Sequence, residues 1–177
     1  MNDSLFEQIQ DAAGYLNLDL DAQEMALFAV GHEFSEENIR AVAAMLAHLQ
    51  QKKKENIVST LLRLSRLPLK EPKTFESFDF GQLHGRQTDA LKNLSSLSAL
   101  YAHKNLAFIG PQGVGKTHLA MAYGRKCCQN GLKAYFLKAT ELNQRLTDAR
   151  RYGRESSVIN GLVKPTCLII DEIGRCV

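Results

Sequence analysis

The sequence predicts an α/β fold, in which a parallel sheet with crossover helices follows a small all-helical N-terminal region. Three observations support this. Short apolar stretches recur with helix-forming segments between them, a glycine-rich run directly follows the first stretch, and a long uninterrupted helical pattern precedes them all. We therefore expect a helical region over residues 1–70 and a second domain over residues 71–177.

The first region is predicted to consist of helices with recognisable starts. Ser4-x-x-Glu7 and Asp21-x-x-Glu24 each have the form of a capping box, an N-cap oxygen with a glutamate three residues later, and apolar residues at helical spacing follow each. From Ser35, which can cap, to Leu67 there is neither glycine nor proline, and apolar residues recur at helical spacing. This stretch predicts one long helix or two in tandem.

Prolines mark the boundary before the second domain. Pro68 and Pro72 interrupt the helical pattern, because proline lacks the backbone N–H and disfavours helix in the preceding residue. The elements expected after them are a helix around Arg86 to Tyr101, a strand ending at Ile109, a helix to about Asn130-Gly131, a strand at Lys133 to Leu137, a helix at Glu141 to Tyr152, a shorter helix before Val163 and a strand at Cys167 to Asp171.

Composition excludes disordered and fibrous classes, because 45% of the 177 residues are apolar. The net charge of +3 is unevenly distributed. Residues 1–37 contain nine acidic residues and no Lys or Arg, so the remainder carries +12. Such a basic body fits a polyanionic partner, but also a protein that binds only nucleotide. Lys52-Lys53-Lys54, in the middle of the long helix, leaves open either a solvated face or a DNA contact.

The N-terminus and the cysteines favour a soluble, cytoplasmic protein. No run of 18 or more apolar residues exists, and the first residues are acidic where a signal peptide would be basic. Cysteine spacing matches no zinc or redox pattern, so we expect buried, reduced thiols at Cys127, Cys128, Cys167 and Cys176.

The glycine-rich run, which we call the phosphate loop, spans residues 110–117 and fits G-x-x-x-x-G-K-[ST] at every fixed position. In such a loop, backbone N–H groups at a helix start converge on phosphates. Lys116 is expected to reach the β- and γ-phosphates of a nucleoside triphosphate, and the Thr117 hydroxyl to bind Mg²⁺. The residues expected to bind the nucleotide are Gly110, Pro111, Gln112, Gly113, Val114, Gly115, Lys116, Thr117 and His118.

An acidic pair ends the last apolar stretch. Asp171 is expected to hold the Mg²⁺ shell, and Glu172 to polarise the water that attacks the phosphate, which makes Glu172 the predicted catalytic residue. This tandem argues against a small-molecule kinase, which would not need the hydrolytic glutamate. Because the histidines show no ligand cluster, we expect no metal other than Mg²⁺.

Two further groups of residues keep alternative interpretations. Four arginines between the second and third strands fit a phosphodiester backbone or a solvated, salt-bridged helix face: Arg145, Arg150, Arg151 and Arg154. Three aromatic residues before the nucleotide domain either wall an adenine pocket or pack into the core: Phe75, Phe78 and Phe80.

Three motifs in order carry a family resemblance. They are T-F-E-S-F-D-F at 74–80, F-I-G-P-Q-G-V-G-K-T-H-L-A at 108–120 and L-I-I-D-E-I-G at 168–174. With them the chain resembles the IstB-like ATPases, transposition helper proteins of IS21-type insertion sequences that are related to the DnaC helicase loaders. The likeness covers about residues 72–177, and the combination of motifs is more specific than a phosphate loop alone.

The resemblance implies an AAA+ ATPase that binds ATP with Mg²⁺ and binds DNA with little sequence specificity. It also implies self-association on DNA with ATP and regulation of a partner transposase. Carried over onto this sequence, Gly110 to Thr117 are the Walker A motif, and Asp171 and Glu172 the Walker B pair. A replicative helicase loader, or a non-catalytic remnant that binds DNA or a partner, are the alternatives.

The resemblance also implies the strand order 5-1-4-3-2, in which the strand between the Walker A and Walker B strands follows them in sequence. Only five residues follow Glu172. We therefore expect a C-terminally incomplete AAA+ domain with that place in the sheet empty, an exposed apolar edge and doubtful hydrolysis. The family's sensor residue, its inter-subunit arginine and its lid have no counterpart, and Arg175 is too close to the Walker B strand to be that arginine.

Overall fold

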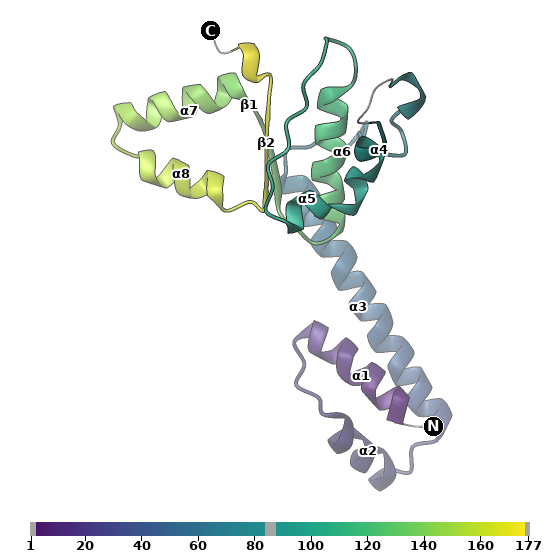
Figure 1. The fold of residues 1–177 in the computed structure, drawn as a ribbon. Coiled ribbons are helices and arrows are strands. Elements are labelled where there is room, and N and C mark those ends of the chain that lie inside the picture. The colour runs from purple at the N-terminus through teal and green to yellow at the C-terminus, as the bar shows by residue number, and fades with distance from the viewer. Residues whose placement is uncertain (1–2, 84–87, 176–177) are drawn as a thin grey trace. The chain divides into compact units, whose positions relative to one another are not determined.

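The computed structural model describes residues 3–83 and 88–175, which form two compact units, Met1–Ile57 and Val58–Val177 (Figure 1). The predicted domain boundary near residue 70 stays a prediction. Leu67 already belongs to the hydrophobic core of the second unit.

The first unit contains three helical segments around a small core. They are α1 (Asp3–Leu16), α2 (Ala22–Gly31) and the first part of α3 (Glu36–Leu64). Their buried apolar residues are Phe6, Ile9, Ala29 and Ile39. The long helix predicted from Ser35 onward is therefore confirmed as one continuous element of 29 residues.

The caps of these helices follow the sequence with one exception. The Asp21 carboxylate accepts the backbone N–H groups of Gln23 and Glu24 at 2.9 and 3.1 Å, as the predicted cap of α2 should. Ser35 and Asn38 bond reciprocally at the start of α3, so asparagine takes the place of the usual glutamate. The cap predicted at Ser4 is wrong, because α1 already includes this residue.

The lysine triplet of α3 contacts its own unit. Lys53 donates to the carbonyl oxygen of Tyr15 at 2.8 Å, at the end of α1, where a cation complements the helix dipole. Lys52 pairs with Glu55 at 3.2 Å, and the ammonium of Lys54 lies 5.0 Å from the centre of the Tyr15 ring. These contacts account for the triplet without a DNA contact.

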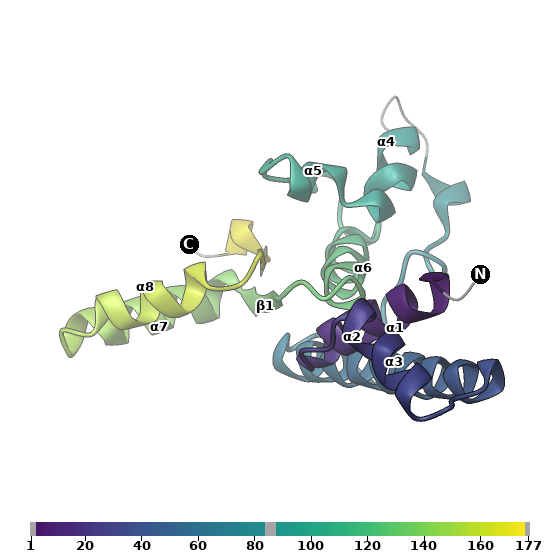
Figure 2. The same cartoon turned by 90° about the horizontal axis from the view of Figure 1, so that it is seen from below.

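The second unit has a parallel two-stranded sheet among its described residues, and this parallel pairing was predicted. Ala134 lies opposite Cys167 and Lys138 opposite Asp171. In both views the strand pair lies between one helix and a helical hairpin (Figure 1, Figure 2). The elements in order are α6 (Lys116–Gln129), β1 (Ala134–Lys138), α7 (Ala139–Arg151), α8 (Glu155–Val163) and β2 (Cys167–Asp171).

Helix α6 packs closely on both strands because it carries a glycine at the contact. A Cβ added to Gly124 would lie 2.5 Å from Cδ1 of Ile169 and 3.6 Å from Cβ of Ala134. Cys167 and Ile169 face this helix, and the period of two along a strand brings Asp171 to the same side. The packing therefore directs the predicted metal ligand toward α6.

Buried, unbridged thiols form part of this core, as predicted. Cys127, Cys128 and Cys167 are buried and free, and Cys176 lies outside the described residues. The pKa of the Cys127 thiol is raised, first by its hydrogen bond with Cys167 and then by burial.

The single helix predicted around Arg86 to Tyr101 is wrong. The chain forms α4 (Thr88–Lys92), a 3₁₀ turn (Asn93–Ser96) and α5 (Ser98–Tyr101), and Arg86 lies outside the described residues. Leu97 breaks the helix with a φ of 56°, and its side chain is buried. The hydroxyl of Ser96 bonds to the Asn93 carbonyl oxygen, an alternative to the helical ladder that serine often offers.

The strand predicted to end at Ile109 does not form either. Residues 106–109 pair with no strand among the described residues, whose sheet consists of β1 and β2. The side chain of Ile109 is 93% exposed. The adjacency of β1 and β2 agrees with the implied strand order, in which the strand before the phosphate loop is not a neighbour of either.

No helix among the described residues is long and apolar enough to cross a membrane.

Candidate nucleotide-binding site

Two positions of the phosphate loop have backbone conformations that favour glycine. Gly113 and Gly115 have φ values of 87° and 85°, in the left-handed region. Helix α6 begins immediately afterwards at Lys116, and no side chain caps it. The first N–H groups of the helix are therefore available to an anion, in the direction that the helix dipole favours.

Lys116 folds back over this loop. Its ammonium donates to the carbonyl oxygens of Gly110 and Pro111, at 2.9 and 2.6 Å. The side chain is partly buried, so the charge lies against the loop and not in open solvent. A phosphate bound by the loop would meet this ammonium.

Thr117 and Asp171 meet across 54 residues of sequence. The threonine hydroxyl donates to the two carboxylate oxygens of Asp171 at 2.9 and 3.1 Å. Asp171 reaches it from the carboxyl end of β2, and Thr117 from the first turn of α6. The structure therefore brings together the two residues predicted to bind the metal.

Glu172 lies next to this pair with a lysine as ion-pair partner. Its carboxylate is 3.3 Å from the ammonium of Lys138, which ends β1. The backbone of Glu172 is left-handed, with a φ of 59°. Sequence reasoning missed the contact of Lys138 with Glu172. Parallel strands place their carboxyl ends at one edge of a sheet, so opposite charges at the ends of two such strands are a signal of an ion pair there.

The aromatic segment at 74–80 packs against the phosphate loop and α6. A Cβ on Gly115 would lie 2.5 Å from the Phe78 ring. Phe78 also contacts the rings of Phe80 and His118, with centroids 4.8 and 5.2 Å away. His118 binds the carbonyl oxygen of Thr74 at 2.8 Å through Nε2, which must then carry the proton.

The predicted site residues are thus arranged as one surface around the loop. Pro111, Gln112, Gly113 and Val114 are exposed on it, whereas His118 faces the aromatic segment. Sequence reasoning left open whether the phenylalanines wall an adenine or pack into the core. Phe75 packs against the core of the second unit, while Phe78 borders the loop itself.

The residues present fit Mg²⁺ held together with phosphates. Hydroxyl and carboxylate oxygens are the ligands that this ion prefers, and it usually takes one or two protein ligands beside phosphate oxygens and water. No group of three His, Cys, Asp or Glu suited to a metal exists in the part of the chain that the structure describes. Thr117 and Asp171 alone do not make a closed protein site, so phosphate oxygens and water would have to supply the other ligands of the ion.

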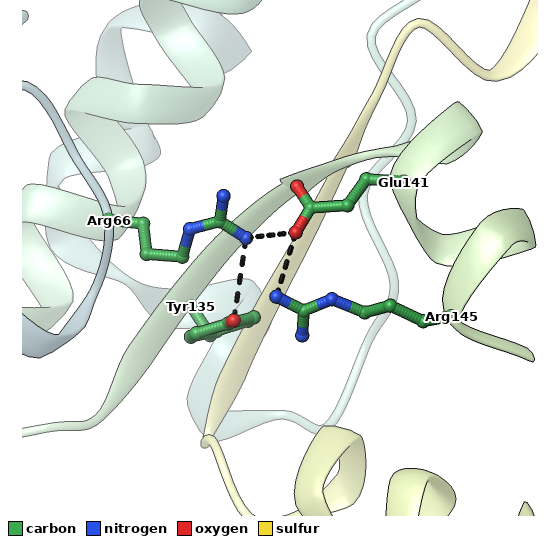
Figure 3. Close-up of polar contacts among 4 residues, drawn as sticks. All are labelled: Arg66, Tyr135, Glu141 and Arg145. Carbon is green, nitrogen blue, oxygen red and sulfur yellow. Dashed lines mark hydrogen bonds and ion pairs between the residues drawn. The ribbon is translucent and has the colours of Figure 1, made fainter. Parts of the chain in front are cut away.

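A second polar cluster joins the end of α3 to β1 and α7 (Figure 3). Arg66 and Arg145 both bind Oε1 of Glu141, at 2.5 and 2.7 Å, and Arg66 also lies 3.5 Å from the Tyr135 hydroxyl. The hydrogen bond between Arg66 and Glu141 lowers the pKa of the Glu141 carboxyl and raises the pKa of the Arg66 guanidinium. Burial alone would raise the pKa of the Tyr135 hydroxyl. The hydrogen bonds and charges of Arg66 and Arg145 together outweigh burial, so this pKa lies below its ordinary value.

The remaining arginines of the predicted row lie where α7 meets α8. We call residues 150–154 the hairpin tip. Arg150 and Arg151 end α7, and Arg154 precedes α8 with its guanidinium 5.2 Å from the centre of the Tyr152 ring. Arg150 is 4.0 Å from the Glu155 carboxylate but its side chain is 85% exposed. Arg145 is therefore engaged within the fold, whereas the other three present their charge to solvent.

Comparisons with known proteins identify relatives from insertion sequences. The chain is 34% identical to a protein named as ATP-binding protein of insertion sequence IS5376 from Geobacillus stearothermophilus, over 95% of this chain and 66% of the relative. It is 28% identical to the corresponding IS232 protein of Bacillus thuringiensis subsp. berliner, over 96% of this chain and 67% of that protein. The chain thus spans about two thirds of the length of these relatives. The model of the IstB-like ATP binding protein family matches residues 13–176, and the chain therefore belongs to this family.

Proposed function

We propose that this chain is an ATP-binding helper of IS21-type DNA transposition, which binds DNA and regulates a partner transposase through ATP binding and hydrolysis. The observation that carries the proposal is the contact between Thr117 and Asp171 beside an uncapped helix start. Such a contact joins a phosphate-binding loop to a carboxylate on the neighbouring sheet, as an ATP and Mg²⁺ site requires.

In this proposal each group at the site has a separate task. Backbone N–H groups of the loop and Lys116 bind the phosphates, and Lys116 exchanges its two neutral carbonyl acceptors for charged phosphate oxygens. Thr117 and Asp171 hold Mg²⁺, which supplies charge neutralisation at the phosphates. Glu172 accepts a proton from the attacking water, once its carboxylate leaves Lys138.

DNA is proposed to bind at the hairpin tip. Arg150, Arg151 and Arg154 extend from it beside the exposed ring of Tyr152, and the chain after residue 37 carries +12. Arginine contacts with phosphates carry no sequence information, which fits binding with little sequence specificity. Glu141 neutralises Arg145, so we assign this arginine a structural task.

The relatives support transposition over helicase loading. The first proteins matched are named for insertion sequences, and we extend that association, together with self-association on DNA, to this chain as part of the proposal.

The test is a nucleotide-dependent thermal shift. We expect ATP with Mg²⁺ to raise the melting temperature of the wild type and to leave Lys116→Ala unchanged, because the lysine charge faces the phosphates in a partly buried loop. Lys126→Ala is the matched control, since Lys126 lies in the last turn of the same helix. Equal shifts in wild type and Lys116→Ala would refute the site and favour the non-catalytic remnant.

A second measurement tests the DNA surface. Replacing Arg150, Arg151 and Arg154 with glutamine should weaken binding to duplexes of unrelated sequence alike, and should flatten its dependence on salt, because fewer counterions are released. Replacing Arg63, an exposed arginine of α3, is the control. Unchanged salt dependence in the triple variant would remove DNA binding from the hairpin tip.

A further inference from the structure

Helix α2 is apolar on two faces, and only one of them is used. Ala29 is buried in the core of the first unit, and Met25 and Ala26 pack against that core. On the other side, Leu27 is 75% exposed and Val30 is 79% exposed. Apolar side chains on a second face of a helix are normally covered by another surface.

An aromatic group extends this outer face. Phe28 is more than half exposed, and its ring centroid lies 4.2 Å from that of His32 and 5.8 Å from that of Phe34. These contacts hold Phe28 in one orientation, so the face offers a bulky apolar anchor at little cost in side-chain entropy. We call Leu27, Phe28 and Val30 the α2 face.

The charged side chains of the segment that carries the α2 face are acidic. Residues 1–37 contain nine acidic side chains and no Lys or Arg. Four of the acidic residues are exposed on α2 or directly beside it: Asp19, Asp21, Glu24 and Glu33. An occupant of this face must therefore bring positive charge together with apolar side chains.

That chemistry disfavours two occupants. Nucleic acid is disfavoured, because its phosphates would meet the exposed carboxylates on α2 and beside it. A symmetric contact with a second copy is disfavoured as well, because an isologous interface places the same acidic residues opposite each other.

We propose that the α2 face docks a basic, apolar-bearing surface of the partner transposase. The inference rests on the proposed function, which supplies this partner, and it assigns the contact to the first unit. A protein that handles DNA carries basic surface, which complements the acidic residues around Leu27 and Val30.

The experiment measures binding of the full chain to the purified transposase encoded by the same insertion sequence. Leu27→Gln with Val30→Gln should weaken this binding by about tenfold or more, because two apolar side chains lose their burial. Met45→Gln, on α3 of the same unit and 61% exposed, is the control and should bind as the wild type does. A second variant, Glu24→Gln with Glu33→Gln, keeps the apolar residues and should reduce the salt dependence of binding.

Other outcomes overturn the inference in distinguishable ways. If the variant with Leu27→Gln and Val30→Gln binds the transposase normally, the α2 face is not the contact. If this variant instead loses self-association, the occupant is a second copy. If its only change is tighter DNA binding, the acidic segment covers basic residues of this chain. If the wild type fails to bind the transposase, the inference and the partner assignment both fail, while the ATP-dependent thermal shift still tests the nucleotide site separately.

Discussion

Replacing Gly115 with alanine tests how the phosphate loop is held. Gly113 and Gly115 share the same left-handed conformation, with φ values of 87° and 85°. They differ in their surroundings, because an added Cβ meets nothing within 4 Å at Gly113 but lies 2.5 Å from the Phe78 ring at Gly115. The two substitutions therefore share one cost and differ in a second.

The shared cost is the left-handed backbone of a residue with a Cβ, about 1–2 kcal/mol, offset by about 0.4–1 kcal/mol from the less flexible unfolded chain. Gly113→Ala should then lower the free energy of unfolding by about 1 kcal/mol. Gly115→Ala also forces the Phe78 ring to shift, and overpacking of this kind costs about 1–3 kcal/mol more.

Urea denaturation of the nucleotide-free protein measures both costs. In a Phe78→Ala background the ring is absent, so the difference between the two glycine variants should shrink toward zero, which a double-mutant cycle reports. Equal destabilisation by the two glycine substitutions, or a difference that persists without the ring, would refute the packing of the aromatic segment on the loop.

Three further predictions concern other contacts. The hydrogen bond from Arg66 lowers the pKa of Glu141 below its ordinary value of 4.5, so the stability that this carboxylate contributes is present above pH 4.5 and is lost as the pH falls through the pKa of the folded state. The urea midpoints of wild type and Glu141→Gln should therefore converge on acidification. Midpoints that stay equally far apart would contradict this. Gly124→Ala should destabilise the fold, and less so in an Ile169→Val background, which lacks the Cδ1 atom that the new methyl meets; calorimetry of the four proteins checks this. Glu172→Gln should keep nucleotide affinity and abolish phosphate release, and retained release would exclude this residue as the base.

Several features set by neighbouring residues were predicted correctly, although the cap at Ser4 was not. The cap at Asp21 and the end of α6 at Asn130, followed by left-handed Gly131, each depend on short-range chemistry. β2 has the predicted bounds, because its short apolar run is followed directly by charged residues. Sequence reasoning assigned Thr117 and Asp171 to one Mg²⁺ shell, and the structure brings these two residues into contact.

Contacts between distant segments were less accessible from the sequence. Nothing local indicates that Phe78 touches Gly115, or that Arg66 reaches Glu141, because each partner lies far away along the chain. The break at Leu97 was missed for a similar reason. A left-handed leucine is unfavourable by itself, and burial of its side chain in the core compensates.

Residues 106–109, before the phosphate loop, show which contacts hold the site. Their apolar side chains predicted a strand, but a strand also needs a partner, and exposed Ile109 has none among the residues that the structure describes. The loop nevertheless keeps its left-handed glycines and its contact with Asp171, because α6 is packed on both strands through Gly124 and Phe78 lies against Gly115. The loop is therefore positioned by the helix that follows it and by the aromatic segment, and not by residues 106–109. It follows that Ile109→Lys should lower the free energy of unfolding far less than Gly115→Ala does. If both substitutions lowered it equally, residues 106–109 would be the main support of the loop, and this reasoning would be refuted.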